Sequence, residues 1–163
     1  MGTMAMVVFS LTFAYSVRAA TPTSQRDATK TLERAILLAG PSVAGLPIAL
    51  AEVPPAEASR GVEGWMLPRQ DQTPAQIVVY SGSDVFRCAS HPTRPDYQCL
   101  LKVASTIIHE AWHYRHGPDE AGAYDTQIAF LTGSGGSSLN ISGVRRARAR
   151  VLAAQQAIER RQR

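Results

Sequence analysis

The sequence predicts an α+β fold in which short strands precede a helical C-terminal half. Residues 76–80 (QIVVY) form the strongest strand-like run of the chain and are bounded by turn-forming residues. Residues 97–115 carry apolar side chains almost all round a helical period, which is typical of a buried helix. The chain has 163 residues, 45% of them hydrophobic and 18% charged, which suits one globular domain.

The elements before residue 97 are short except for the first. A helix is predicted from Ser24, a suitable N-cap with Asp27 three residues later, to the residue before Gly40. Residues 41–60 are interrupted by prolines and hold one possible strand, in residues 47–53. A further short run, residues 63–68 (EGWMLP), precedes the strand at residues 76–80. One face of the predicted helix is formed by Leu32, Ala35, Ile36 and Ala39.

The C-terminal half reads as three helices. Gly117 and Pro118 end the helix of residues 97–115, and a second helix is expected to begin at Pro118, because proline suits the first helical position. Residues 132–138 (TGSGGSS) read as a loop, and residues 141–163 as a long helix with a basic first half.

The two ends of the chain differ from the body in composition. The first twenty residues hold an apolar run followed by small residues, which resembles a secretory signal with a cleavage site after Ala19 or Ala20. A short buried helix or an uncleaved anchor is the alternative. Residues 144–163 contain seven arginines and one glutamate, so the rest of the chain carries a net charge of −2. We therefore expect no nucleic-acid-binding surface on the body, and residues 144–163 either pack as a plain helix or make weak contact with an anionic membrane surface.

Cys88 and Cys99 are the only cysteines. In an exported protein they are expected to form a disulfide, whereas two free buried thiols are expected in a protein that is not exported. The spacing does not fit a zinc-ligand pair.

A possible metal site lies in the buried helix, where His109, Glu110 and His113 form the pattern H-E-x-x-H. Histidines four residues apart project from one face of a helix and can bind one Zn²⁺. The glutamate can then act as a general base towards water at the metal. The alternative is a pair of structural histidines.

Two histidines leave one protein ligand to be found. His116 lies too far along the same helix, which leaves Asp119 and Glu120. Glu120 is preferred because it shares a helical stripe with Tyr124 and Gln127 on the predicted inward face of the second helix, whereas Asp119 lies one step round.

The chain resembles the zincin metallopeptidases, in particular the gluzincin-like group, through HEAWH (residues 109–113) and EAGA (residues 120–123). The resemblance covers residues 76–131. It implies a small mixed sheet with an edge strand over the buried motif helix, followed by a ligand helix and a C-terminal helix. By the same analogy, residues 76–82 would be the edge strand that faces an extended peptide substrate.

The resemblance also implies a mechanism. His109, His113 and Glu120 would bind Zn²⁺, and Glu110 would transfer the proton in peptide hydrolysis. Tyr124 is a candidate catalytic residue, as a hydrogen-bond donor to the oxyanion. Asp119 and Asp125 are candidates for orienting an imidazole ligand.

The sequence therefore predicts a signal peptide (residues 1–20), a metallopeptidase-like domain (residues 21–143) and a basic helix (residues 144–163). The expected function is zinc-dependent hydrolysis of a peptide or protein substrate in the periplasm or secreted space. The alternative is an exported metal-binding or structural protein without catalytic activity.

Overall fold

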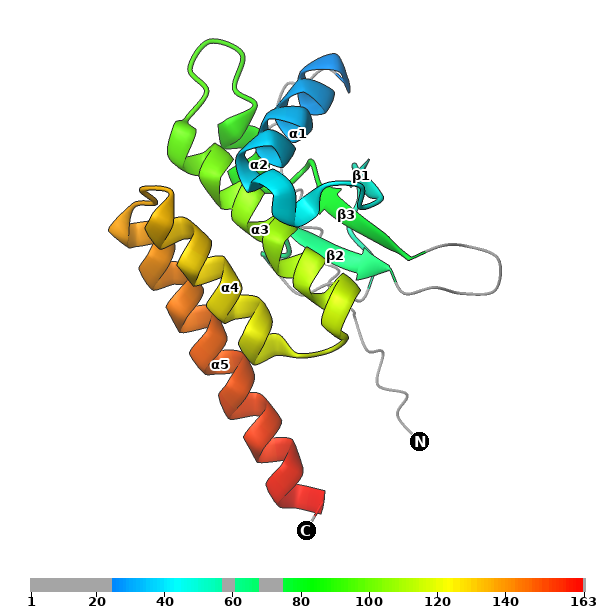
Figure 1. Cartoon of the computed structure of the whole chain (residues 1–163), viewed down its shortest axis with the longest axis vertical. Coiled ribbons are helices and arrows are strands. Elements are labelled where there is room, and N and C mark those ends of the chain that lie inside the picture. Colours follow the sequence, from blue (N-terminus) through cyan, green and yellow to red (C-terminus); the bar gives the residue numbers. More distant parts are fainter. Residues whose placement is uncertain (1–24, 57–60, 68–74, 163) are drawn as a thin grey trace, which may run out of the picture.

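The computed structural model describes residues 25–56, 61–67 and 75–162 and has a mixed α+β architecture (Figure 1). The predicted signal peptide lies outside these residues. A three-stranded sheet is formed by β1 (Ile48–Ala51), β3 (Gln76–Tyr80) and β2 (Gly64–Leu67), in that order. β1 is parallel to β3 and β2 is antiparallel to it. The helices are α1 (Gln25–Ala39), the 3₁₀-helix η1 (Gly40–Val43), α2 (Asp84–Ala89), α3 (Tyr97–His116), α4 (Glu120–Gly133) and α5 (Ser138–Gln162).

Helix α3 is the centre of the structure, with α1, α2 and two strands on one side and α4 on the other (Figure 1). The main core lies between α1, β3, α2 and α3, and its fully buried side chains include Ala35, Ile77, Phe86 and Ile107. A smaller core joins α3, α4 and α5 through Leu101, Leu131 and Val144. Because both faces of α3 are covered, a polar residue on it must be paired or must line a cavity.

Helix α4 begins at Glu120, two residues later than the expected start at Pro118. Asp119 is the N-cap, and its carboxylate accepts a hydrogen bond from the backbone N–H of Gly122, so Pro118 lies just before the helix. Gly117 ends α3 with a φ of 74°, a left-handed conformation that favours glycine. The two helices are joined by a short turn, and α4 therefore packs back along α3.

The strand at residues 76–80 was predicted with the correct limits, but its expected position at the edge of the sheet is wrong. β3 is the central strand, with hydrogen-bonded neighbours on both sides. Its buried apolar centre explains this position, since Ile77, Val78 and Val79 are at most 4% exposed. The edge strand that contacts α3 is β2.

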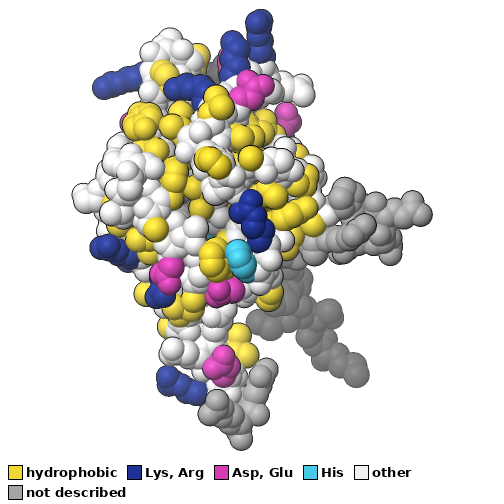
Figure 2. Space-filling model, in the orientation of Figure 1, with side chains coloured by type: hydrophobic (Ala, Val, Ile, Leu, Met, Phe, Trp, Pro, Cys, Tyr) yellow, Lys and Arg dark blue, Asp and Glu magenta, His cyan; other side chains and the backbone are white. Residues whose placement is uncertain are grey.

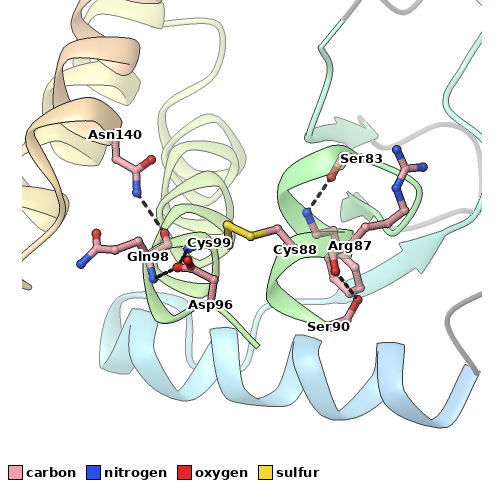
Figure 3. Close-up of a disulfide and its surroundings, with 9 residues drawn as sticks. Ser83, Arg87, Cys88, Ser90, Asp96, Gln98, Cys99 and Asn140 are labelled. Atoms are coloured by element: carbon pink, nitrogen blue, oxygen red, sulfur yellow. Dashed lines mark hydrogen bonds between the residues drawn. A yellow bond between two sulfur atoms is a disulfide. The ribbon is translucent and has the colours of Figure 1, made fainter. Parts of the chain in front are cut away.

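The expected disulfide is present between Cys88 of α2 and Cys99 in the first turn of α3 (Figure 3). Helix α2 was not predicted from the sequence, because its six residues are too few to show a helical period. It is capped by Ser83, whose side chain accepts a hydrogen bond from the N–H of Phe86. The disulfide therefore attaches this short helix to the N-terminal end of α3, close to the Asp96 cap.

No helix in the described ranges is long and apolar enough to cross a bilayer.

Candidate metal centre

The two histidines of the H-E-x-x-H pattern lie side by side on α3. His109 and His113 are one helical turn apart, and their Nε2 atoms are separated by 3.2 Å. The His109 residue is 9% exposed, and the side chain of His113 is 10% exposed. The helix thus places two imidazole nitrogens at one point, and little water reaches either ring.

Glu120, the first residue of α4, brings a carboxylate to the same point. Its Oε2 lies 3.6 Å from Nε2 of His109, and its Oε1 lies 3.6 Å from Nε2 of His113. One ligand atom from each of the three residues lies within 4.8 Å of the others. We call these three residues the triad.

Asp119, the alternative third ligand, is engaged elsewhere. Besides capping α4, its carboxylate accepts a hydrogen bond of 3.3 Å from the indole N–H of Trp112. Gly122 allows this contact, because a Cβ there would lie 2.3 Å from Asp119 and 2.5 Å from Trp112. His116 stacks on Trp112, with the two ring centroids 4.0 Å apart. Within the described chain, neither Asp119 nor His116 belongs to the triad's group of ligand atoms.

The orientation of each imidazole has a different origin. Nδ1 of His113 lies 2.9 Å from the carbonyl oxygen of Gly117 and can donate to it, which directs the Nε2 lone pair towards the triad. Nδ1 of His109 is buried and makes no hydrogen bond to any described residue. The side chain of Gln127 interacts with this imidazole, and its amide N–H donates a hydrogen bond of 3.1 Å to Oγ of Ser105.

The acidic residues that the sequence suggested for orienting an imidazole do not do so. Asp119 contacts Trp112, and Asp125 forms a two-pronged ion pair of 2.8 and 2.9 Å with Arg148 of α5. The polar side chain of α4 that interacts with His109 is instead Gln127, which is 4% exposed. Its place on the stripe of Glu120 and Tyr124 was visible in the sequence, but an acidic side chain was expected.

Burial affects the two neighbouring groups of the pattern in opposite ways. It lowers the pKa of His109 to about 4, with further lowering by the charges of His113 and Lys102 and an opposing effect of Gln127. His109 is therefore neutral near pH 7, as a metal ligand must be. Burial also raises the pKa of Glu110 to about 8, with a further increase from Glu120 and a smaller opposing effect of a backbone hydrogen bond from Met66.

Tyr124 lies beside the triad, next to His109. Its ring meets that of His109 edge to face, with the centroids 4.6 Å apart. Burial raises the pKa of its hydroxyl above 10, and the charges of Glu120 and Glu110 raise it further. The hydroxyl is therefore protonated near neutral pH and can donate a hydrogen bond.

The triad lies between two cavities that share Gly64, His109, Glu110 and Glu120. The smaller, of about 390 Å³, is bordered by β2 and by Gly117 and Pro118. The larger, of about 570 Å³, extends between α3, α4 and α5, and we call it the α5 cleft. The protein can therefore admit a ligand on either side of the triad.

Strand β2 approaches α3 closely because residue 64 is glycine. A Cβ at this position would lie 2.9 Å from the carbonyl oxygen of Val78 and 3.0 Å from Cγ2 of Thr106. Glu63, the residue before β2, forms an ion pair with Lys102 and accepts a hydrogen bond of 2.7 Å from the hydroxyl of Thr106. These contacts fix the start of β2 against the motif helix.

The register leaves backbone groups of β2 at the open edge. Tyr80 donates its N–H to the carbonyl of Glu63, and antiparallel pairs alternate between bonded and non-bonded positions. Gly64 and Met66 fall on the non-bonded positions opposite Val79 and Ile77. Their peptide groups therefore face away from β3, which agrees with the hydrogen bond from Met66 to Glu110.

A second group of possible ligands, Cys88, Asp96 and Cys99, does not have the donors of a metal site. Both sulfur atoms are joined in the disulfide, and the carboxylate of Asp96 accepts hydrogen bonds from the N–H groups of Gln98 and Cys99 (Figure 3). This group is structural.

A comparison with protein-family models finds no match to this chain, and comparisons with curated sequences and with solved structures find none either.

Proposed function

We propose that this protein is an exported, zinc-dependent peptide-bond hydrolase that acts in the periplasm or the secreted space. The observation that carries the proposal is the convergence of two imidazoles and a carboxylate at one wall of a cleft, with Glu110 beside them. This set of groups agrees with the resemblance of residues 109–123 to the gluzincin-like metallopeptidases. The disulfide is compatible with an oxidising location.

The spacing of the triad fits zinc. Tetrahedral coordination at about 2.0–2.1 Å places neighbouring ligand atoms about 3.3–3.4 Å apart. The observed separations are 3.2 Å between the imidazoles and 3.6 Å from each imidazole to the carboxylate. Two nitrogens and one oxygen are also a ligand set found in catalytic zinc sites, which keep one position for water or substrate.

Zinc, when bound, would polarise the substrate carbonyl and acidify water in the cleft. Glu110 would accept a proton on its carboxylate from the attacking water and pass it to the leaving amine. Its raised pKa, about 8 without metal, suits a group that takes up and releases a proton near neutral pH. Tyr124, held protonated beside the triad, would donate its hydroxyl proton in a hydrogen bond to the oxyanion.

The open edge of β2 would hold the substrate. The peptide groups of Gly64 and the carbonyl of Met66 face away from β3 beside the smaller cavity and can pair with an extended chain, as an added strand does, while the N–H of Met66 is bonded to Glu110. β2 thus takes the substrate-binding role that the sequence assigned to residues 76–82.

The first test compares the metal content of the purified mature protein with that of two matched variants. Glu120→Gln removes a carboxylate of the triad, whereas Asp119→Asn removes a neighbouring charge and keeps a residue that caps helices well. We expect about one zinc per chain in the wild type and in Asp119→Asn, and strong loss in Glu120→Gln. The reverse order would show that Asp119 is the ligand, and a wild type without zinc in excess metal would refute the metal site.

The second test separates a peptidase from a non-catalytic zinc protein. Glu110→Gln should retain zinc and lose peptide hydrolysis, because an amide cannot accept the proton. Zinc binding without hydrolysis of any peptide by the wild type would favour the non-catalytic alternative.

A further inference from the structure

Helix α5 turns a single charge towards the α5 cleft. The first half of this helix is strongly basic, but its arginines have different surroundings. Arg148 is held by Asp125 of α4, and Val144, 3% exposed, is packed in the smaller core. These two contacts set the rotation of α5. Its cleft-lining residues are Gly143, Val144, Ala147, Arg150 and Val151.

Arg150 has no ion pair or hydrogen bond with any residue in the described ranges. Lys102, the other cation that lines the α5 cleft in the described part of the chain, is paired with Glu63. Arg150 is close enough to Tyr124 for its charge to oppose the increase in that hydroxyl's pKa. Its guanidinium therefore lies on the side of α5 that faces the triad, with its hydrogen-bond donors available to a ligand.

The α5 cleft becomes positively charged when the triad holds a divalent ion. Among the described residues, the carboxyls and cations that line the α5 cleft are Glu63, Glu110, Glu120, Lys102 and Arg150, a balance of −1 when all are charged. A divalent ion would change this balance to +1. The smaller cavity, by contrast, is bordered by Trp65, Met66 and Pro118, and no lysine or arginine of the described ranges lines it.

We propose that Arg150 binds a substrate carboxylate in the α5 cleft, so that the preferred substrates are peptides with an acidic side chain or a free C-terminus close to the cleaved bond. This inference rests on the proposed hydrolase function and names the substrate class of the same site. A guanidinium can hold a carboxylate through two parallel hydrogen bonds, which positions the substrate as well as attracting it. The apolar border of the other cavity would accept an uncharged part of the same chain.

The chain offers a matched control for this role. Arg145 is also exposed on α5, but at 100° per residue it lies about 160° from Ala147, the centre of the cleft-facing side. Arg145→Ala and Arg150→Ala thus remove the same charge from opposite faces of one helix. Because both side chains are exposed, both variants are expected to fold.

The experiment uses the zinc-loaded protein and a defined peptide mixture. Peptides are supplied in pairs that differ only by Glu against Gln, or by a free against an amidated C-terminus, and cleavage is followed by mass spectrometry. We expect kcat/KM to be about tenfold higher for the acid member of a pair. Arg150→Ala should reduce the ratio to about one, and Arg145→Ala should leave it unchanged. The type of pair that shows the effect identifies the source of the carboxylate.

Equal cleavage of the paired peptides by the wild type would overturn the proposal, as would a preference that persists in Arg150→Ala or disappears in Arg145→Ala. If no peptide is cleaved, the hydrolase proposal fails, and the role of Arg150 is tested separately by peptide binding. Fluorescence anisotropy with labelled pairs and zinc-supplemented Glu110→Gln should then still show about tenfold tighter binding of the acid member. Equal affinities, or no binding, would refute the role of Arg150.

Discussion

The buried carboxyl of Glu110 makes the stability of the metal-free protein depend on pH in a predictable way. Its pKa is about 8 in the folded protein and about 4.5 when the chain is unfolded. The folded state therefore binds this proton more tightly. The contribution to stability is complete below pH 4.5 and is lost as the pH rises through 8.

The window from pH 6.5 to 8.0 isolates this effect. His109, with its pKa lowered from 6.5 to about 4, costs stability only as the pH falls below 6.5. Above that value Glu110 is the dominant shifted group, and each pH unit is equivalent to about 1.4 kcal/mol. We therefore expect the metal-free wild type to lose about 2 kcal/mol in free energy of unfolding between pH 6.5 and 8.0.

The perturbation is Glu110→Gln, measured by urea unfolding in the presence of a chelator. Glutamine has nearly the same shape and can still accept the hydrogen bond from Met66, but it does not ionise. Its free energy of unfolding should change by less than about 0.5 kcal/mol over the same window. Glu159→Gln, which removes an exposed carboxylate from α5, should retain the wild-type slope. Parallel slopes for the wild type and Glu110→Gln would refute the raised pKa.

Three further perturbations test the surroundings of the triad. Gln127→Leu removes the polar side chain that interacts with the His109 imidazole and should weaken zinc binding by about 10- to 100-fold, measured by competition with a chromogenic chelator. Gln127→Glu should restore the affinity. Unchanged affinity in Gln127→Leu would refute a positioning role for Gln127. Gly64→Ala should lower the thermal midpoint of unfolding and any peptidase activity, because the added Cβ forces β2 away from α3. Gly133→Ala is the control and should lower neither, because a Cβ at residue 133 meets nothing within 4 Å. Replacement of both Cys88 and Cys99 by alanine should lower the free energy of unfolding by about 3 kcal/mol, which is the chain-entropy value for a loop of this length. A loss below about 1 kcal/mol would contradict the stabilising role of the disulfide.

The basic residues of α5 are not a single surface. Arg148 is paired with Asp125 of α4 and Arg150 lines the α5 cleft, so these two charges are directed towards the rest of the protein. On the face shown in Figure 2, lysine and arginine side chains are distributed over several elements and interspersed with acidic ones. Contact between residues 144–163 and an anionic membrane stays a prediction, which vesicle binding with and without these residues would test.

Local patterns in the sequence determined most of the secondary structure. The spacing of apolar residues defined α1, α3 and β3, and the pair of Gly117 and Pro118 marked the turn into α4. The four-residue separation of His109 and His113 was enough to place both on one face, because a helix imposes that geometry without help from the rest of the fold. Helical phase similarly favoured Glu120 over Asp119, and the structure brings Glu120 to the two imidazoles.

Only the tertiary structure decided which elements meet around that point. The order of the strands depends on pairing between distant segments, so the sequence could not show that β2, rather than β3, is the open edge beside α3. Gln127 faces His109 and Arg150 faces the cleft because α4 and α5 pack at particular rotations, which are set by Leu131, Val144 and the Asp125–Arg148 pair. Periodicity along one helix identifies its inward face, but which groups that face meets is determined by contacts between residues far apart in the chain.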